Sequence, residues 1–122
     1  MQRIHAAGIF VLAGFIVGFD SEQHEVAPEM ISCIAEAAIP VCMAGLLVAL
    51  PNTQLYRRLN REGRLFSVEW LLDRMKAEGG DQCTLGLNFE TRRSRRDVLA
   101  DYRRVLEAIY TPQAYFARVK AV

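Results

Sequence analysis

Two short polar turns follow the two most apolar stretches of the chain, and their residue types could hold a polar small molecule. Asp20, Ser21 and Glu22 come directly after the first stretch, and Asn52 lies in the turn after the second. Carboxylate and amide oxygens accept hydrogen bonds from hydroxyl and amino groups, and a serine hydroxyl can donate or accept one. Gly18 allows close approach to the backbone. We predict a binding site without catalytic residues, because no complete catalytic set accompanies these turns.

The same residues also allow a structural interpretation. Asp20, Ser21 and Glu22 could simply cap the helical segment that follows them, and the sequence leaves both interpretations open. His5 and His24 are separated in the sequence and are not part of an acid–nucleophile pattern, and we interpret both as surface residues.

The cysteines give no sign of a metal site. Cys33, Cys42 and Cys83 are far apart, and their spacing matches neither a zinc motif nor an iron–sulfur motif. We interpret them as buried thiols of a cytoplasmic protein, with no metal ligands among them.

To bring the two polar turns together, the apolar stretches must be strands that end at the same edge of a sheet. Residues 9–18 and 41–50 are rich in aliphatic residues and carry no charge, which predicts strands buried on both faces. A helix that begins near Pro28 separates them, and its apolar face comprises Met30, Ile31, Ile34, Ala37 and Ala38. A strand-helix-strand unit of this length predicts parallel strands.

The rest of the chain predicts helices, with capping residues that mark where each one begins. Thr53, Ser67, Ser94 and Thr111 are the predicted N-caps, and the second of these helices ends at Gly79–Gly80. The clearest apolar stripe comprises Val98, Leu99, Tyr102, Val105, Leu106 and Ile109. The last helix presents Tyr115, Phe116 and Val119 on one side, and we expect Trp70 to anchor the second helix to the core.

The predicted fold class is therefore α/β, a parallel strand-helix-strand unit followed by a mostly helical carboxyl-terminal appendage. The strand-helix-strand unit is typical of a piece of a parallel barrel. The 122 residues are too few for a closed eight-stranded barrel, which needs about 200 or more. The apolar stretches are also shorter than the roughly 20 residues of a membrane-spanning helix.

The charge distribution argues against nucleic acid as a partner. The formal net charge is +1, which gives no general attraction to polyanions or to anionic lipid. The only feature that suggests nucleic acid or another anion is the cluster of Arg92, Arg93, Arg95, Arg96, Arg103 and Arg104. Two acids, Asp97 and Asp101, interrupt it, and we interpret the cluster as a solvated face rather than a binding surface.

Four blocks of sequence, in this order along the chain, carry a resemblance to a known family: GFIVGFDSE, IPVCMAGLLVALPNTQLYRRLNREGRL, LNF and DYRRVLEAIYTPQAYFARV. The chain resembles the carboxyl-terminal part of cobalamin-binding radical SAM proteins, and the resemblance covers nearly all of it. The resemblance divides the chain into residues 1–64, which are similar to the end of the partial barrel, and residues 65–122, which are similar to the helical domain of unknown function that follows it. It implies that the first turn lies beside S-adenosylmethionine, so that Gly18, Asp20, Ser21, Glu22 and Asn52 would bind this cofactor. Asn52 stands where many relatives have glycine, and asparagine also tolerates a left-handed backbone.

One departure limits what the resemblance implies. The family holds an iron–sulfur cluster through Cys-x-x-x-Cys-x-x-Cys, and this sequence does not contain that motif. We therefore expect a fragment that is inactive alone and carries no resident cofactor when isolated, with the missing amino-terminal part of the barrel as its partner. The alternative is a stand-alone structural module that forms a homo-oligomer.

Overall fold

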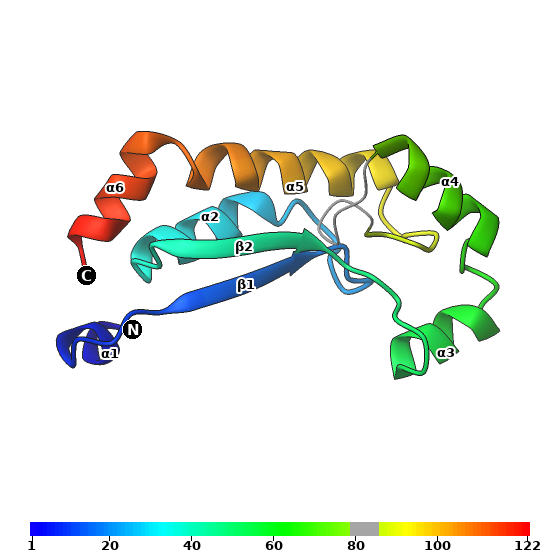
Figure 1. The fold of residues 1–122 in the computed structure, drawn as a ribbon, viewed down its shortest axis with the longest axis horizontal. Coiled ribbons are helices and arrows are strands. Elements are labelled where there is room, and N and C mark those ends of the chain that lie inside the picture. The colour runs from blue at the N-terminus through cyan, green and yellow to red at the C-terminus, as the bar shows by residue number, and fades with distance from the viewer. Residues whose placement is uncertain (79–85) are drawn as a thin grey trace.

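The computed structural model describes residues 1–78 and 86–122, and Figure 1 shows their arrangement. The elements in chain order are α1 (Gln2–Ala6), β1 (Leu12–Val17), α2 (Ala27–Glu36), β2 (Val41–Leu46), α3 (Gln54–Arg61), α4 (Val68–Glu78), α5 (Arg95–Ile109) and α6 (Pro112–Lys120). The mixed α/β class with a helical carboxyl-terminal part is thus confirmed. The short helix α1 was not predicted.

The two strands pair in parallel, as the strand-helix-strand pattern predicted. Their register runs from Leu12 opposite Val41 to Val17 opposite Leu46. Both strands are shorter than the apolar stretches that contain them. Pairing continues for one more hydrogen bond, in which the Leu47 amide donates to the Val17 carbonyl over 2.9 Å. The polar turns after the strands therefore lie at one edge of the sheet.

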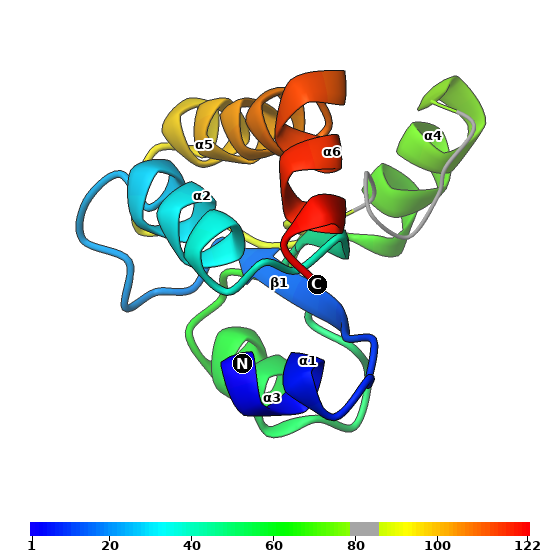
Figure 2. The ribbon, with the colours of Figure 1, turned by 90° about the vertical axis from the view of Figure 1, so that its left-hand side faces the viewer.

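Helices α2, α5 and α6 lie on one side of the sheet, and Figure 2 shows this layer end-on. The long helix α5 joins two apolar clusters. Val98 packs with Val17 and Leu59 near the carboxyl ends of the strands, and Val105 and Ile109 pack with residues of α2 and β2 further along. The predicted stripe of α5 is thus the element that holds the sheet and the helical part together.

The prediction that the strands are buried on both faces is wrong. Side chains alternate along β1, and Val17 is buried while Leu12 and Ile16 are 69% and 48% exposed. On β2, Met43 is 69% exposed between buried neighbours. The reason is that helices cover only one face of the two strands in the part of the chain that the structure describes. The uninterrupted apolar sequence therefore leaves one apolar face open.

The predicted capping residues are confirmed. The side chains of Thr53, Ser67, Ser94 and Thr111 each accept a hydrogen bond from the backbone amide three residues later, over 3.1 to 3.3 Å. These bonds satisfy amides that have no partner inside a helix. Helix α4 ends at Glu78, and the predicted stop at Gly79–Gly80 lies outside the described residues.

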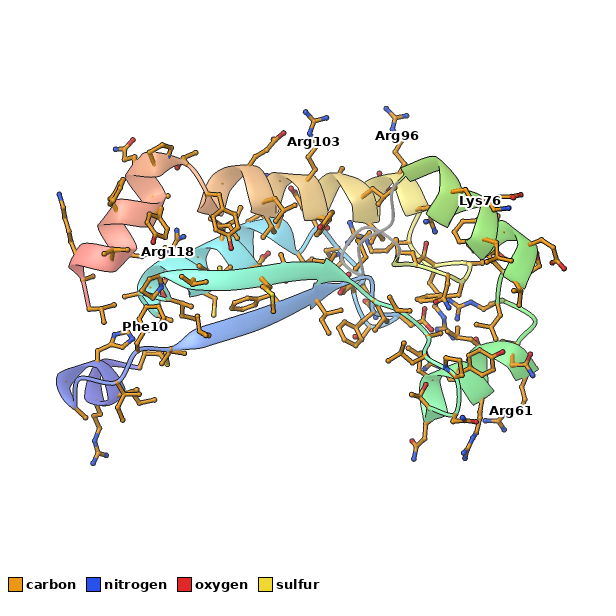
Figure 3. The ribbon with its side chains drawn as sticks, viewed as in Figure 1. Phe10, Arg61, Lys76, Arg96, Arg103 and Arg118 are labelled. Carbon is orange, nitrogen blue, oxygen red and sulfur yellow. The ribbon has the colours of Figure 1, made fainter. Side chains whose placement is uncertain are left out.

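The apolar side predicted for α6 is not its buried side. Phe116 and Val119 are exposed, and the buried residue is Arg118, which is 4% exposed. Figure 3 shows its side chain pointing into the molecule, whereas Arg103 points away from α5. The Arg118 Nε donates to the Ile39 carbonyl over 2.8 Å, and its Nη2 donates to the Ile109 carbonyl over 2.6 Å. Carbonyl groups that would lack partners therefore determine which side of α6 is buried.

The cysteines differ from one another in exposure, and so do the two histidines. Cys42 is buried, and burial raises the pKa of its thiol. Cys33 is exposed, so the prediction of a buried thiol is wrong there, and Cys83 lies outside the described residues. His24 is exposed as predicted, whereas His5 is half-buried. Within residues 1–78 and 86–122, no helix has the length and apolar character to cross a membrane.

Candidate ligand-binding edge

The candidate site lies where the two strands end. The turn after β1 contains Gly18 to Glu22, and the turn after β2 runs through Asn52 into α3. The carboxyl ends of parallel strands are the usual location of ligands in α/β proteins, because the loops that follow them converge there. The structure therefore brings the predicted residues to one edge, although it gives them different roles.

The carboxylate of Glu22 accepts hydrogen bonds from the backbone at the start of the first turn. The amide of Gly18 donates to both carboxylate oxygens of Glu22, over 2.9 and 3.0 Å, and the amide of Phe19 donates to Oε1 over 3.0 Å. Gly18 itself is buried with a φ of +112°, and a Cβ there would lie 2.5 Å from a methyl carbon of Leu87. Only glycine fits this position, and the carboxylate of Glu22 fixes the turn that follows it.

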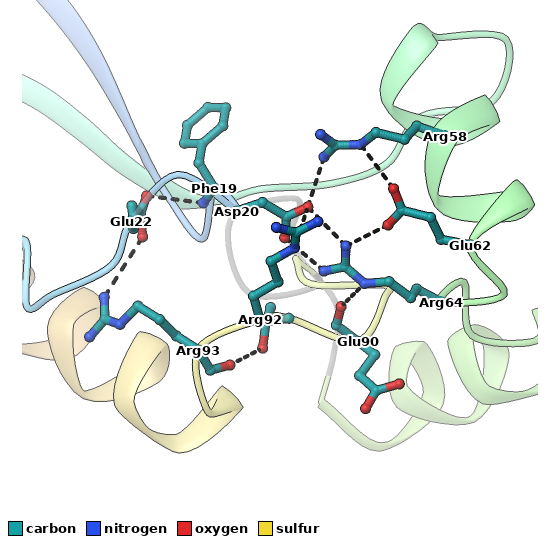
Figure 4. A network of polar contacts seen from close by, with 10 residues as sticks. Phe19, Asp20, Glu22, Arg58, Glu62, Arg64, Glu90, Arg92 and Arg93 are labelled. Atoms are coloured by element: carbon teal, nitrogen blue, oxygen red, sulfur yellow. Dashed lines mark hydrogen bonds and ion pairs between the residues drawn. The ribbon is translucent and has the colours of Figure 1, made fainter.

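Asp20 is held by arginines, and Figure 4 shows the network. Arg64 binds it through two parallel bonds, Nη2 to Oδ1 over 2.7 Å and Nη1 to Oδ2 over 2.8 Å. Arg58 of α3 adds a contact of 2.9 Å to Oδ2, and the Nε of Arg92 lies 3.8 Å from the same oxygen. Arg64 also donates to the Glu90 carbonyl over 2.8 Å. Asp20 is therefore the centre of a network that joins the β1 turn to the helical part.

The electrostatics follow from this geometry. The hydrogen bond from Arg64 lowers the pKa of the Asp20 carboxyl below its ordinary value, against the opposing effect of burial, and the charges of Arg64, Arg58 and Arg92 lower it further. The same pairing raises the pKa of Arg64. The side chain of Asp20 is only 11% exposed. It stays ionised at neutral pH and is already saturated with donors.

Ser21 and Asn52 are the predicted residues whose side chains face solvent. Ser21 is exposed in the first turn. Asn52 is exposed in the second with a φ of +67°, which confirms the expected left-handed backbone, and its carbonyl accepts a bond from Arg57 of α3. Neither side chain has a hydrogen-bond partner among the described residues. Their hydroxyl and amide groups are thus free to bind a ligand.

A third segment, residues 86–89, completes the edge. The Leu87 amide donates to the Leu47 carbonyl over 2.7 Å, beyond the end of β2. The side chain of Asn88 then clamps the backbone of Ala49, accepting from its amide over 2.8 Å and donating to its carbonyl over 3.0 Å. A bridge between Leu65 and Phe89 fixes the other side of this segment. The chain just after β2 is therefore held firmly in place.

The arginine cluster is only partly the solvated face that was predicted. Arg93 pairs with the buried Asp101 over 2.8 Å, and Asp101 also accepts from the Val26 amide over 3.1 Å. Arg95 donates to the Leu87 carbonyl over 2.6 Å and lies over the ring of Trp70. These arginines turn inward because buried acceptors lie within their reach.

We expected Trp70 to anchor α4 in the core. Besides Arg95, its ring contacts the ring of Phe66, with 4.4 Å between the ring centres.

The sequence interpretation missed the arginines that hold Asp20. Arg64 is 44 residues away from it along the chain, and no local pattern connects the two. Asp101 did carry a signal, since it lies three residues after Val98 and four before Val105, on the apolar stripe of α5. An acid at such a position predicts a buried partner.

The fold is a mixed α/β segment, in which two parallel strands are followed by a helical carboxyl-terminal part. The chain belongs to the DUF4070 family, described as a domain of unknown function, whose family model matches residues 53–122. The matched region begins before the division at residues 64 and 65 that we predicted. That division remains a prediction.

Two relatives are similar in sequence. One is described as an uncharacterized methyltransferase of Synechocystis, 35% identical over 97% of this chain and 20% of the relative. The other is a hopanoid C-2 methylase of Rhodopseudomonas palustris, 40% identical over 53% of this chain and 12% of the relative. No solved structure matches the chain. The matches confirm the resemblance to the carboxyl-terminal part of cobalamin-binding radical SAM proteins, and the chain spans about a fifth of the first relative's length.

Proposed function

We propose that this chain forms the carboxyl-terminal segment of a radical SAM methyltransferase, in which its strand edge binds part of S-adenosylmethionine. The observation that carries the proposal is the common edge, where the turns after β1 and β2 present Ser21 and Asn52 to solvent. The relatives named as methyltransferases support it. When bound, S-adenosylmethionine supplies the methyl group or the radical for the reaction.

The residues at the edge fit this cofactor in two different roles. Ser21 and Asn52 have hydroxyl and amide groups that suit its ribose and its amino acid part. Gly18, Asp20 and Glu22 act by fixing the shape of the first turn, because their backbone or side chains are already engaged within the protein. The five residues predicted from the sequence thus form the proposed site, and two of them make the proposed direct contacts.

The described residues do not fit an iron–sulfur cluster. Cys33 is exposed on α2, whereas Cys42 is buried in β2, and no group of three potential ligands exists among the residues that the structure describes. We propose that the cluster, the cobalamin and the rest of the barrel belong to parts of the protein outside this chain, and that the chain alone has no activity. The cytoplasm is the proposed location.

Titration with S-adenosylmethionine, followed by amide-resolved NMR, tests this site. We expect saturable shifts at Gly18, Ser21 and Asn52, and none at Arg96 on the outer face of α5, where Figure 3 shows it pointing away from the molecule. Removing the Ser21 hydroxyl takes away one hydrogen bond to the ligand, so Ser21→Ala should weaken binding about fivefold.

The matched control is Ser32→Ala, because Ser32 is also exposed but bonds only to Glu36 within α2. It should leave the affinity unchanged. A well-dispersed spectrum in which the turns ignore the ligand would contradict the proposal, and so would equal weakening by the two serine variants.

The open face of the sheet favours a second candidate, a structural module that self-associates. Leu12, Ile16 and Met43 place apolar side chains on this face, and a two-stranded sheet also leaves strand edges unpaired. Covering the face, by a second copy or by the rest of a longer chain, would remove this surface from water.

Sedimentation analysis tests the second candidate. If the open face drives association, the chain should be dimeric at micromolar concentration, and Met43→Asp should shift it to monomer because a carboxylate would be buried unpaired. Phe116→Asp, an exposed position on α6, is the control and should leave the dimer intact. A monomer at every concentration would eliminate this candidate.

A further inference from the structure

An apolar pocket lies beside the candidate edge. Its volume is about 620 Å³. One wall is the chain leaving β2, residues 46–51, and the opposite wall comprises Leu65, Phe66 and Val68, which precede or begin α4. Ile16 of β1 also lines it. A volume of this size lies within the range of roughly 300 to 1,000 Å³ that small-molecule sites occupy.

The lining is almost purely hydrocarbon. None of the lining residues that the structure describes carries a charge, and the polar side chains among them are Tyr56 and Asn88. The amide group of Asn88 is already bonded to the backbone of Ala49. Leu50 and Val68 nevertheless remain 58% and 66% exposed. A ligand that removes these side chains from water must itself be apolar.

The walls are held in place by backbone hydrogen bonds. Asn88 fixes Ala49 on the first wall, and the amide of Phe66 on the second wall donates to the Asn88 carbonyl over 3.0 Å. The amide of Glu90 donates to the Arg64 carbonyl over 2.8 Å. Asn88 thus connects both walls, and the pocket exists before any ligand enters, as is usual for small-molecule sites.

We propose that this pocket binds the apolar hydrocarbon body of a lipid-like substrate. The inference rests on the proposed methyltransferase function and adds the substrate class to it. Ile16, on the pocket side, precedes Gly18 by two residues, so an occupant of the pocket lies next to the edge where the methyl donor is proposed to bind. The helical part, through Phe66 and Val68, would then contribute to substrate recognition.

The single tryptophan of the chain allows occupancy to be measured. The ring of Trp70 contacts that of Phe66 in a tilted arrangement, with ring centres 4.4 Å apart, and Phe66 lines the pocket. A ligand that enters the pocket should therefore change the fluorescence of Trp70. We would titrate the chain with 1-adamantanol, an uncharged compact polycyclic alcohol, and expect a saturable change.

Two substitutions on α4 form a matched pair. Val68→Asp places a carboxylate in the pocket and should weaken 1-adamantanol binding by about tenfold or more, because the charge loses hydration when the ligand enters. The substitution suits the first turn of a helix, where an acid is favourable, so the fold should survive. Leu72→Asp is the control, since Leu72 is 49% exposed on the same helix and does not line the pocket. Its affinity should equal that of the parent chain.

Two results would overturn the inference: no saturable change with 1-adamantanol, or equal weakening by Val68→Asp and Leu72→Asp. The cofactor proposal is tested separately. S-adenosylmethionine binding is measured at the amides of Ser21 and Asn52, and pocket binding at Trp70, so each can fail while the other holds.

Discussion

Replacing Asp20 with asparagine should lower the free energy of unfolding by about 2–4 kcal/mol at neutral pH. The substitution keeps the size of the side chain but removes the charge at the centre of the network, and it leaves Arg64, which is only 14% exposed, with Glu62 as its remaining acidic partner at 2.8 Å. Removing one partner from a largely buried ion-pair network costs up to several kcal/mol. Urea unfolding at pH 7 would measure the difference.

Glu90→Gln is the control for this experiment. Only the backbone carbonyl of Glu90 joins the network, and its side chain is exposed and points away from the arginines in Figure 4. An exposed substitution of this kind should change the stability by less than about 0.5 kcal/mol. If both variants unfold at the same urea concentration, the Asp20 network does not stabilise the fold.

The effect of Asp20→Asn on stability should also depend on pH. Pairing with Arg64 lowers the pKa of Asp20 in the folded state, so the unfolded chain binds more protons in the acidic range and stability rises with pH there. The contribution is complete above the ordinary carboxyl pKa of about 4 and is lost as the pH falls through the lowered value. The stability difference between the parent chain and Asp20→Asn should shrink in that window. Parallel curves from pH 6 to pH 2 would contradict this.

Gly86→Ala should destabilise the fold by about 3 kcal/mol or more. A Cβ at Gly86 would lie 2.1 Å from the Cβ of Leu46 and 2.8 Å from its backbone carbonyl. The backbone cannot retreat easily, because the next residue, Leu87, donates to the Leu47 carbonyl over 2.7 Å. Overpacking against a fixed backbone is among the more damaging core changes.

Gly45→Ala provides the comparison within the same sheet. A Cβ at Gly45 of β2 meets no atom within 4 Å, so alanine there should be neutral or slightly stabilising by reducing the freedom of the unfolded chain. Guanidinium unfolding midpoints of the two variants would test the pair. Equal midpoints would show that residues 86–89 do not pack against the end of β2.

Much of the local structure could be predicted from the sequence. The N-caps at Thr53, Ser94 and Thr111 and the apolar stripe of α5 depend on residues within one or two helical turns of one another, and such interactions can be read along the chain. The parallel strand-helix-strand unit follows from the lengths and apolar character of its parts. The two turns of the candidate site were found by the same reasoning.

What the sequence could not determine depends on distant partners. Asp20 and Arg64 are 44 residues apart, and only the folded chain shows that Asp20 organises the edge while Ser21 faces solvent. Arg118 is buried because two carbonyl groups outside α6 accept hydrogen bonds from it. The residue pattern of α6 alone does not indicate these acceptors.

Apart from α1, the sequence alone determined the elements, their order and the edge where the strands end, because propensity, capping and apolar spacing act locally. The tertiary structure decided which polar side chains are saturated, which face of the sheet stays open and where the apolar pocket forms. These depend on how segments such as residues 46–51 and 65–68 meet in space, and no local pattern specifies that meeting.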